Sequence, residues 1–130
     1  MKKVLVRGPL LSQSGYGVHS RQLYRFCESQ KDWNITTQVL PWGCTPWNVS
    51  DEDEDGIYGR IMTASKPVDH KFDISFQIQL PHEWDHELAH FNVGVTAGVE
   101  TDRCSPEWAD LHRKKMNLII VPSSFTKRTF

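Results

Sequence analysis

The sequence predicts an α/β fold, an open parallel sheet flanked by helices. Short apolar segments with strand character alternate with segments of helical periodicity, and Gly, Pro and Ser separate them. One segment, Leu118–Val121, is entirely apolar, as strands buried on both faces of a parallel sheet usually are. A chain of 130 residues is long enough for one domain with its own core, so we expect a single lobe over residues 1–130.

The first predicted unit is a strand, a turn and a helix. The β-branched segment Val4–Val6 predicts the strand, and residues rich in Gly, Pro and Ser follow it. A helical pattern begins at Val18 and is expected to end near Gln30. Leu23, Phe26 and Cys27 share one face of this helix, and we expect that face to be buried.

The segment that follows is less regular. Ile35–Leu40 predicts a second strand, which Pro41 ends. Residues 42–67 are expected to form a long loop with one short strand at Ile57–Met62. The acidic run Asp51–Gly56 begins like a calcium-binding loop, but Met62 stands where that loop needs a bidentate glutamate. We therefore interpret the run as a solvated acidic loop.

Three further strands are predicted in the second half of the chain. Phe72–Leu80 alternates apolar and polar residues, and Phe91–Thr96 is the next apolar segment. Helices are expected to begin at Ser105 and Ser124. Because the second of these is cut short by the end of the chain, we expect the sequence to be a fragment of a longer protein. We expect three segments to be the central strands of the sheet, namely Val4–Val6, Ile74–Ile78 and Leu118–Val121.

Composition argues against several classes of function. The net charge is −1 and 24% of the residues are charged, so no bulk electrostatic attraction to nucleic acid or anionic membranes is expected. The apolar run Val4–Val6 near the N-terminus is too short for a signal peptide or a transmembrane segment. The 3 cysteines show no CxxC spacing, which is typical of reduced thiols in a cytoplasmic protein.

The segment Gly15-Tyr16-Gly17 is a candidate phosphate-binding loop. Glycines allow an anion to approach the backbone, and the N–H groups and dipole of a helix N-terminus attract it. A third glycine is missing, so the segment is not a full dinucleotide fingerprint, and a plain tight turn is the alternative. If the loop binds an anion, Gly17→Val should block it and leave the fold largely intact unless Gly17 has a positive φ.

A second candidate site is Glu100-Thr101-Asp102-Arg103. It follows the predicted strand Phe91–Thr96, and ligands of open α/β sheets bind at the carboxyl ends of the strands. The alternative is a group of acids that stabilises the next helix through its dipole. Because this segment and the glycine loop both follow parallel strands, we expect them to line one depression.

The spacing His82-Glu83-x-x-His86 matches a zinc-binding motif on a helix, and His90 would extend the same face. Pro81, however, would place His82 in the first turn of that helix, where the geometry is least regular. The helix would also be polar on nearly all sides. We therefore expect no bound metal and interpret the segment as a surface helix or loop.

Three segments resemble motifs of retaining GT-B glycosyltransferases of the group 1, family 4-like type. They occur in the same order as in that family: Gly15-Tyr16-Gly17 with Arg21, Glu100-Thr101-Asp102-Arg103 with Pro106 and Trp108, and Ile120-Val121-Pro122-Ser123-Ser124-Phe125. The resemblance covers nearly the whole chain. It implies the N-terminal, acceptor-side lobe of a cytoplasmic enzyme that moves a sugar from a nucleotide-sugar to an acceptor without an essential metal.

The resemblance also implies roles for particular residues. The donor's phosphate and sugar would contact Gly15, Tyr16 and Gly17, whereas Glu100 and Arg103 would orient reacting groups in catalysis. The cleft would also be lined by Thr101, Asp102 and Ser123. No cofactor is implied, since the nucleotide-sugar is a co-substrate.

This sequence departs from the family in two respects. Gln77 and Gln79 stand in a strand that often ends in a histidine, and the family's C-terminal lobe does not follow. We therefore expect the chain alone to be inactive, and to associate with the missing lobe or with itself through an exposed face. The alternative function is a non-catalytic Rossmann-like binding or assembly module, and a more distant one is a zinc hydrolase that uses His82, Glu83 and His86.

Overall fold

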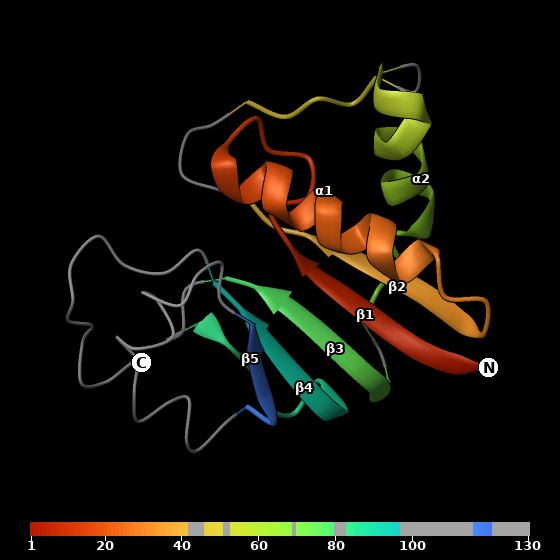
Figure 1. Ribbon diagram of the computed structural model, residues 1–130, viewed down its shortest axis with the longest axis vertical. Helices are drawn as coiled ribbons and strands as arrows, with labels where there is room; N and C mark the ends of the chain where they lie inside the picture. The colour runs from red at the N-terminus through yellow and green to blue at the C-terminus, as the bar shows by residue number, and fades with distance from the viewer. Residues whose placement is uncertain (42–45, 51–52, 69, 80–82, 97–115, 121–130) are drawn as a thin grey trace, which may run out of the picture.

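The protein folds around one parallel β-sheet, and the predicted α/β class is confirmed. The computed structural model describes residues 1–41, 46–50, 53–68, 70–79, 83–96 and 116–120. Its 5-stranded sheet has the order β2-β1-β3-β4-β5, and every neighbouring pair is parallel (Figure 1). The strands are β1 (Lys2–Gly8), β2 (Trp33–Val39), β3 (Phe72–Ile78), β4 (Ala89–Val95) and β5 (Leu118–Ile120).

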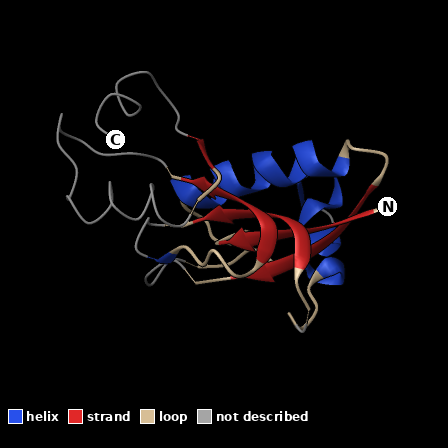
Figure 2. Cartoon of the chain, turned by 90° about the horizontal axis from the view of Figure 1, so that it is seen from below, coloured by secondary structure: helices blue, strands red, loops and turns tan. Residues whose placement is uncertain are grey.

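The described helices lie beside β1 and β2 (Figure 1). Helix α1 (Gly15–Glu28) runs along one face of the strands, as the view from below shows (Figure 2). The 3₁₀ helix η1 (Asp53–Gly56) leads into α2 (Ile57–Ala64), which contacts β2. The larger apolar cluster of the described residues lies between sheet and helices, and a second, smaller cluster consists of Leu5, Phe72 and Ala89. Members of the larger cluster include Val4, Val6, Tyr24, Cys27, Ile57, Ile61, Phe76, Ile78, Val93 and Val95.

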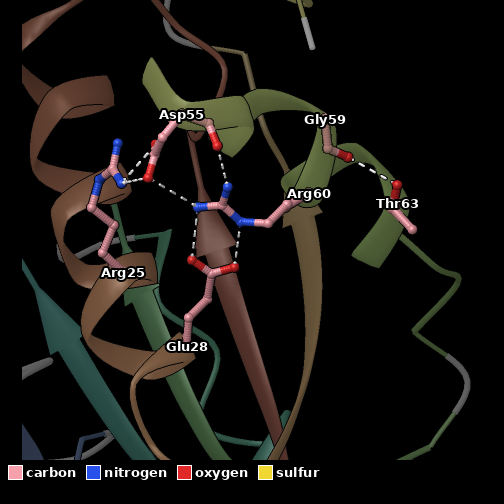
Figure 3. A network of polar contacts seen from close by, with 6 residues as sticks. All are labelled: Arg25, Glu28, Asp55, Gly59, Arg60 and Thr63. Carbon is pink, nitrogen blue, oxygen red and sulfur yellow. Dashed lines mark hydrogen bonds and ion pairs between the residues drawn. The ribbon is translucent and has the colours of Figure 1, made fainter. Parts of the chain in front are cut away.

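Ion pairs join α1 to the segment that contains η1 and α2 (Figure 3). The Arg60 guanidinium donates to both carboxylate oxygens of Glu28, at 2.8 and 3.1 Å. Arg25 donates to Asp55 at 2.9 Å, and Asp55 has a positive φ of 59°. The acidic run therefore contributes at least one side chain to packing between helices, because the Asp55 carboxylate lies against arginines.

The segment Ile57–Met62, predicted as a strand, is helical instead. Ile57, Tyr58 and Ile61 are buried, and this spacing places them on one side of a helix. Gly56 begins the helix with a φ of 81°, a left-handed conformation that glycine adopts without strain. So short an apolar run fits either periodicity, and the packing against β2 decides between them.

Helix α1 also begins earlier than predicted, at Gly15 rather than Val18. Ser14 is its N-cap, and this serine accepts a hydrogen bond from the Gly17 N–H at 3.1 Å. The apolar pattern cannot reveal this first turn, because its residues are Gly and Tyr.

The expectation that Leu118–Val121 forms a central strand is wrong for the part of this segment that the structure describes. β5 pairs with β4 and lies at the edge of the described sheet, and Leu118 is half exposed. An apolar sequence indicates that a strand is hydrophobic, but it does not indicate whether the strand has a neighbour on one side or on both. The other two predicted central strands, in β1 and β3, are confirmed. Val121 and the helices predicted from Ser105 and Ser124 lie outside the described residues.

The order of the strands creates a switch point between β1 and β3. From β1 the chain passes through α1 to β2 on one side, and β3 then pairs with β1 on the other side. An isolated parallel bridge joins Thr37 of β2 to Ser65, which follows α2. In open α/β sheets the connections diverge at such a point and leave a crevice for ligands at the carboxyl ends of the strands. No helix in the described parts of the chain is long and apolar enough to cross a membrane.

Candidate functional site

The carboxyl edge of the sheet holds the N-terminus of α1. There the Gly17 N–H donates to Ser14 Oγ, and the Val18 N–H donates to the Ser14 carbonyl at 3.0 Å. Ser12 Oγ donates to Ser14 Oγ at 2.9 Å, which orients the capping side chain. The Gly17 amide is therefore already used in capping the helix.

Glycine is required at position 17 because the backbone of the preceding loop lies close to it. A Cβ atom at this position would lie 1.9 Å from the carbonyl oxygen of Ser12, which is backbone and cannot rotate away. At Gly15 nothing lies within 4 Å of the corresponding Cβ. The expectation that Gly17→Val leaves the fold largely intact is therefore wrong, because any side chain here displaces the loop that follows β1.

Arg21 stabilises the loop that follows β1. Its side chain is buried, and Nη1 donates to the carbonyls of Leu10 and Ser12 at 3.0 and 2.8 Å. The guanidinium carbon lies 4.9 Å from the centre of the Tyr58 ring, which is within range of a cation–π contact. The spacing between Gly17 and Arg21 thus has a structural explanation that does not involve a ligand. Both residues contact the Ser12 carbonyl, Gly17 by close approach and Arg21 by a hydrogen bond.

Tyr16 connects the start of α1 to the end of β4. Its hydroxyl lies 3.1 Å from Thr96 Oγ1, although a whole strand, β3, separates β1 from β4. Glu100, Thr101, Asp102 and Arg103 follow Thr96 in the sequence, but they and Ser123 lie outside the described residues. The predicted glycine loop therefore contacts the carboxyl end of β4, the strand that precedes the second predicted segment.

A pocket of 170 Å³ lies at the switch point, at the carboxyl ends of β1, β2 and β3. Its walls combine apolar and charged side chains: Arg7, Pro9, Leu40, Pro41, Ile78, Gln79 and Glu83. Sequence reasoning did not single out this pocket. The available signal was Gln79, a polar residue at the carboxyl end of an otherwise apolar strand.

Two of these side chains carry buried polar atoms without a hydrogen-bond partner in the described residues. Gln79 is 4% exposed and its Oε1 is unpaired, as is Nε of Arg7. Gln38, which is in register with Arg7 on β2, has a third such atom. Most buried polar groups in proteins are paired, and each unpaired one costs about 1–3 kcal/mol. An unpaired amide that lines a pocket is therefore a marker for a ligand.

Gln77, by contrast, is fully engaged in structure. Its Nε2 donates to the Asp85 carbonyl, and its Oε1 accepts from the Asp85 N–H, both at 2.7 Å. The indole of Trp84 donates to the Gln77 carbonyl and packs against Gly94, where a Cβ would lie 2.7 Å from the ring. Gln77 thus holds the loop before β4 against the sheet.

The described residues 83–88 form no α-helix, which agrees with the surface loop that was one of the two expected possibilities. Residues 84–88 form a turn region, and His90 lies in β4. His86 is exposed, and His82 lies outside the described residues. Within the described ranges no three His, Cys, Asp or Glu side chains are grouped as metal ligands. The turn at His86 and Glu87 follows Asp85, whose backbone N–H and carbonyl are hydrogen-bonded to the Gln77 side chain.

Two titratable groups on α1 are shaped by burial. Burial raises the pKa of the Cys27 thiol to about 12, so that it remains protonated and unreactive at neutral pH. Burial lowers the pKa of His19 from 6.5, and its Nε2 has no hydrogen-bond partner among the described residues. Partial burial therefore favours the neutral form of the His19 imidazole.

No family model, curated protein or solved structure matched this chain. The fold and the crevice define a Rossmann-like α/β module with a candidate ligand site at the β1/β3 switch point.

Proposed function

We propose that this chain is the acceptor-side lobe of a retaining glycosyltransferase, which moves a sugar from a nucleotide-sugar to an acceptor. The contact between Tyr16 and Thr96 carries the proposal. It connects the glycine-containing start of α1 to the strand end from which Glu100 and Arg103 follow. The order of the three sequence motifs and the parallel sheet also support it.

In this proposal the start of α1 and the segment from Glu100 to Arg103 have different roles. The start of α1, with Gly15, Tyr16 and Gly17, stabilises the diphosphate of the donor through its dipole. Glu100 and Arg103 orient the donor sugar or the acceptor hydroxyls, and Thr101, Asp102 and Ser123 line the cleft. A second lobe supplies most contacts to the nucleotide-sugar, and no metal or cofactor is needed.

The test is release of nucleoside diphosphate and transfer of labelled sugar by the complete gene product that carries these residues. A panel of nucleotide-sugars is supplied with and without acceptor sugars. Arg103→Lys should lower kcat/KM by roughly 10–100-fold, because a bidentate planar group becomes a single point donor. Arg113→Lys is the matched control, because Arg113 is not among the residues proposed for the site, and it should leave turnover unchanged.

A non-catalytic binding module is the second candidate, and the pocket with unpaired Gln79 and Arg7 atoms favours it. The same assay distinguishes the binding module from the transferase. Ligand binding without turnover of any nucleotide-sugar would replace the transferase proposal with the binding module.

A further inference from the structure

We propose that the pocket at the carboxyl ends of β1, β2 and β3 binds a small hydroxylated carboxylate, such as a sugar acid. This inference goes beyond the proposed transfer reaction and does not depend on it, because it concerns binding by the described residues alone.

Gln79 supplies the first reason. Its side chain is 4% exposed, lines the pocket, and has an Oε1 atom without a hydrogen-bond partner among the described residues. Its backbone is fixed, since the Gln79 N–H donates to the Val95 carbonyl at 3.2 Å. An acceptor held in this way is complementary to a hydroxyl group, which can donate the missing hydrogen bond.

Arg7 supplies the charge. It lines the same pocket, and its Nε–H is buried and unpaired within the described part of the chain. A carboxylate is the natural partner for a guanidinium, because charge-assisted hydrogen bonds to it are the strongest available. Arg7 and Gln79 together therefore specify a ligand with both an anionic group and a hydroxyl.

Glu83 narrows the choice of anion. This residue lines the pocket and is itself exposed, so its carboxylate stands at the rim. The negative charge of Glu83 repels a doubly charged phosphate more than a singly charged carboxylate. A singly charged carboxylate therefore fits this arrangement better than a phosphate.

Size and rigidity point to a single sugar ring. The volume of 170 Å³ is below the roughly 300–1,000 Å³ of pockets for drug-sized ligands. Pro9, Leu40, Pro41 and Ile78 offer apolar surface to the carbon skeleton of a ring. The Leu40 N–H donates to the Gly8 carbonyl at 2.9 Å, so this wall is fixed before a ligand arrives.

Calorimetric titration of the 130-residue chain with glucuronate, glucose 6-phosphate and glucose tests the proposal. Glucuronate should bind most tightly. Gln79→Leu and Arg7→Met should each weaken its binding by about 10–100-fold, which is the value of a charge-assisted or buried hydrogen bond.

Gln38→Leu is the matched control, because it removes a buried unpaired amide that is not among the residues lining the pocket. It should retain the affinity for glucuronate. Gln79→Met, which keeps the length of the side chain and lacks the amide oxygen, provides a second variant, and circular dichroism checks that both variants fold. Equal affinities for glucose and glucuronate, tighter binding of glucose 6-phosphate, or no binding of glucuronate would each overturn the proposal.

Discussion

The two glycines that open α1 differ in what surrounds them. Gly17→Ala should destabilise the protein by roughly 1–3 kcal/mol, because the added Cβ would lie 1.9 Å from the Ser12 carbonyl oxygen. Gly15→Ala meets nothing within 4 Å and should be neutral or slightly stabilising. Thermal unfolding measures the difference, at roughly 2–8 °C per kcal/mol. Equal melting temperatures for the two variants would show that the loop at Ser12 does not pack as described.

His19 predicts a pH dependence of stability. Because burial lowers its pKa in the folded state, the unfolded chain binds a proton more readily as the pH falls through 6.5. The contribution of neutral His19 is therefore complete above pH 6.5 and is lost progressively below it. Denaturant unfolding across this range should show a steeper loss of stability in the wild type than in His19→Leu. Identical slopes in the two proteins would contradict the lowered pKa of His19.

At the scale of elements, the loop before β4 depends on Gln77. Gln77→Leu removes both hydrogen bonds to the Asp85 backbone and leaves those groups without their partner. It should cost about 1–3 kcal/mol for each unpaired group, and should also loosen the packing of Trp84 on Gly94. Gln79→Leu is the matched comparison and should be neutral or stabilising, because it removes an amide that lacks a partner. Urea unfolding followed by circular dichroism measures the stability of both variants.

The elements show where sequence reasoning succeeds and where it stops. Alternating or β-branched residues predicted β1, β2, β3 and β4 within a few positions, because strands with buried faces repeat with a period of two. Ile57–Met62 was predicted wrongly, since a short apolar run fits a helix equally well. The spacing of His82 and His86 fits a zinc helix, but the described residues 83–88 form no α-helix.

The candidate site was predictable only in outline. Gly15–Gly17 follows a parallel strand, and its place at the carboxyl edge could be expected from the alternation of strands and helices alone. The pocket could not be predicted, because whether the polar atoms of Arg7 and Gln79 find partners depends on packing across three strands. Gln77 and Gln79 look alike in sequence and have opposite surroundings in the structure.

At the scale of the whole molecule, one edge of the described sheet holds the features on which both proposals rest. The crevice between β1 and β3, the start of α1 and the Tyr16–Thr96 contact all lie at the carboxyl ends of the strands. The opposite edge carries the first residues of the strands, such as Lys2, Trp33 and Ala89. A ligand-binding role for the carboxyl edge underlies both proposals.

Mapping of backbone amide shifts by nuclear magnetic resonance, on the labelled chain titrated with glucuronate and separately with a nucleotide-sugar, tests this role most directly. We expect the glucuronate shifts to centre on Arg7 and Gln79, and the nucleotide-sugar shifts on Tyr16 and Thr96. Amides at the amino ends of the strands should remain unchanged. Shifts that centre on the amino ends, or no shifts with either compound, would contradict a ligand site at the carboxyl edge.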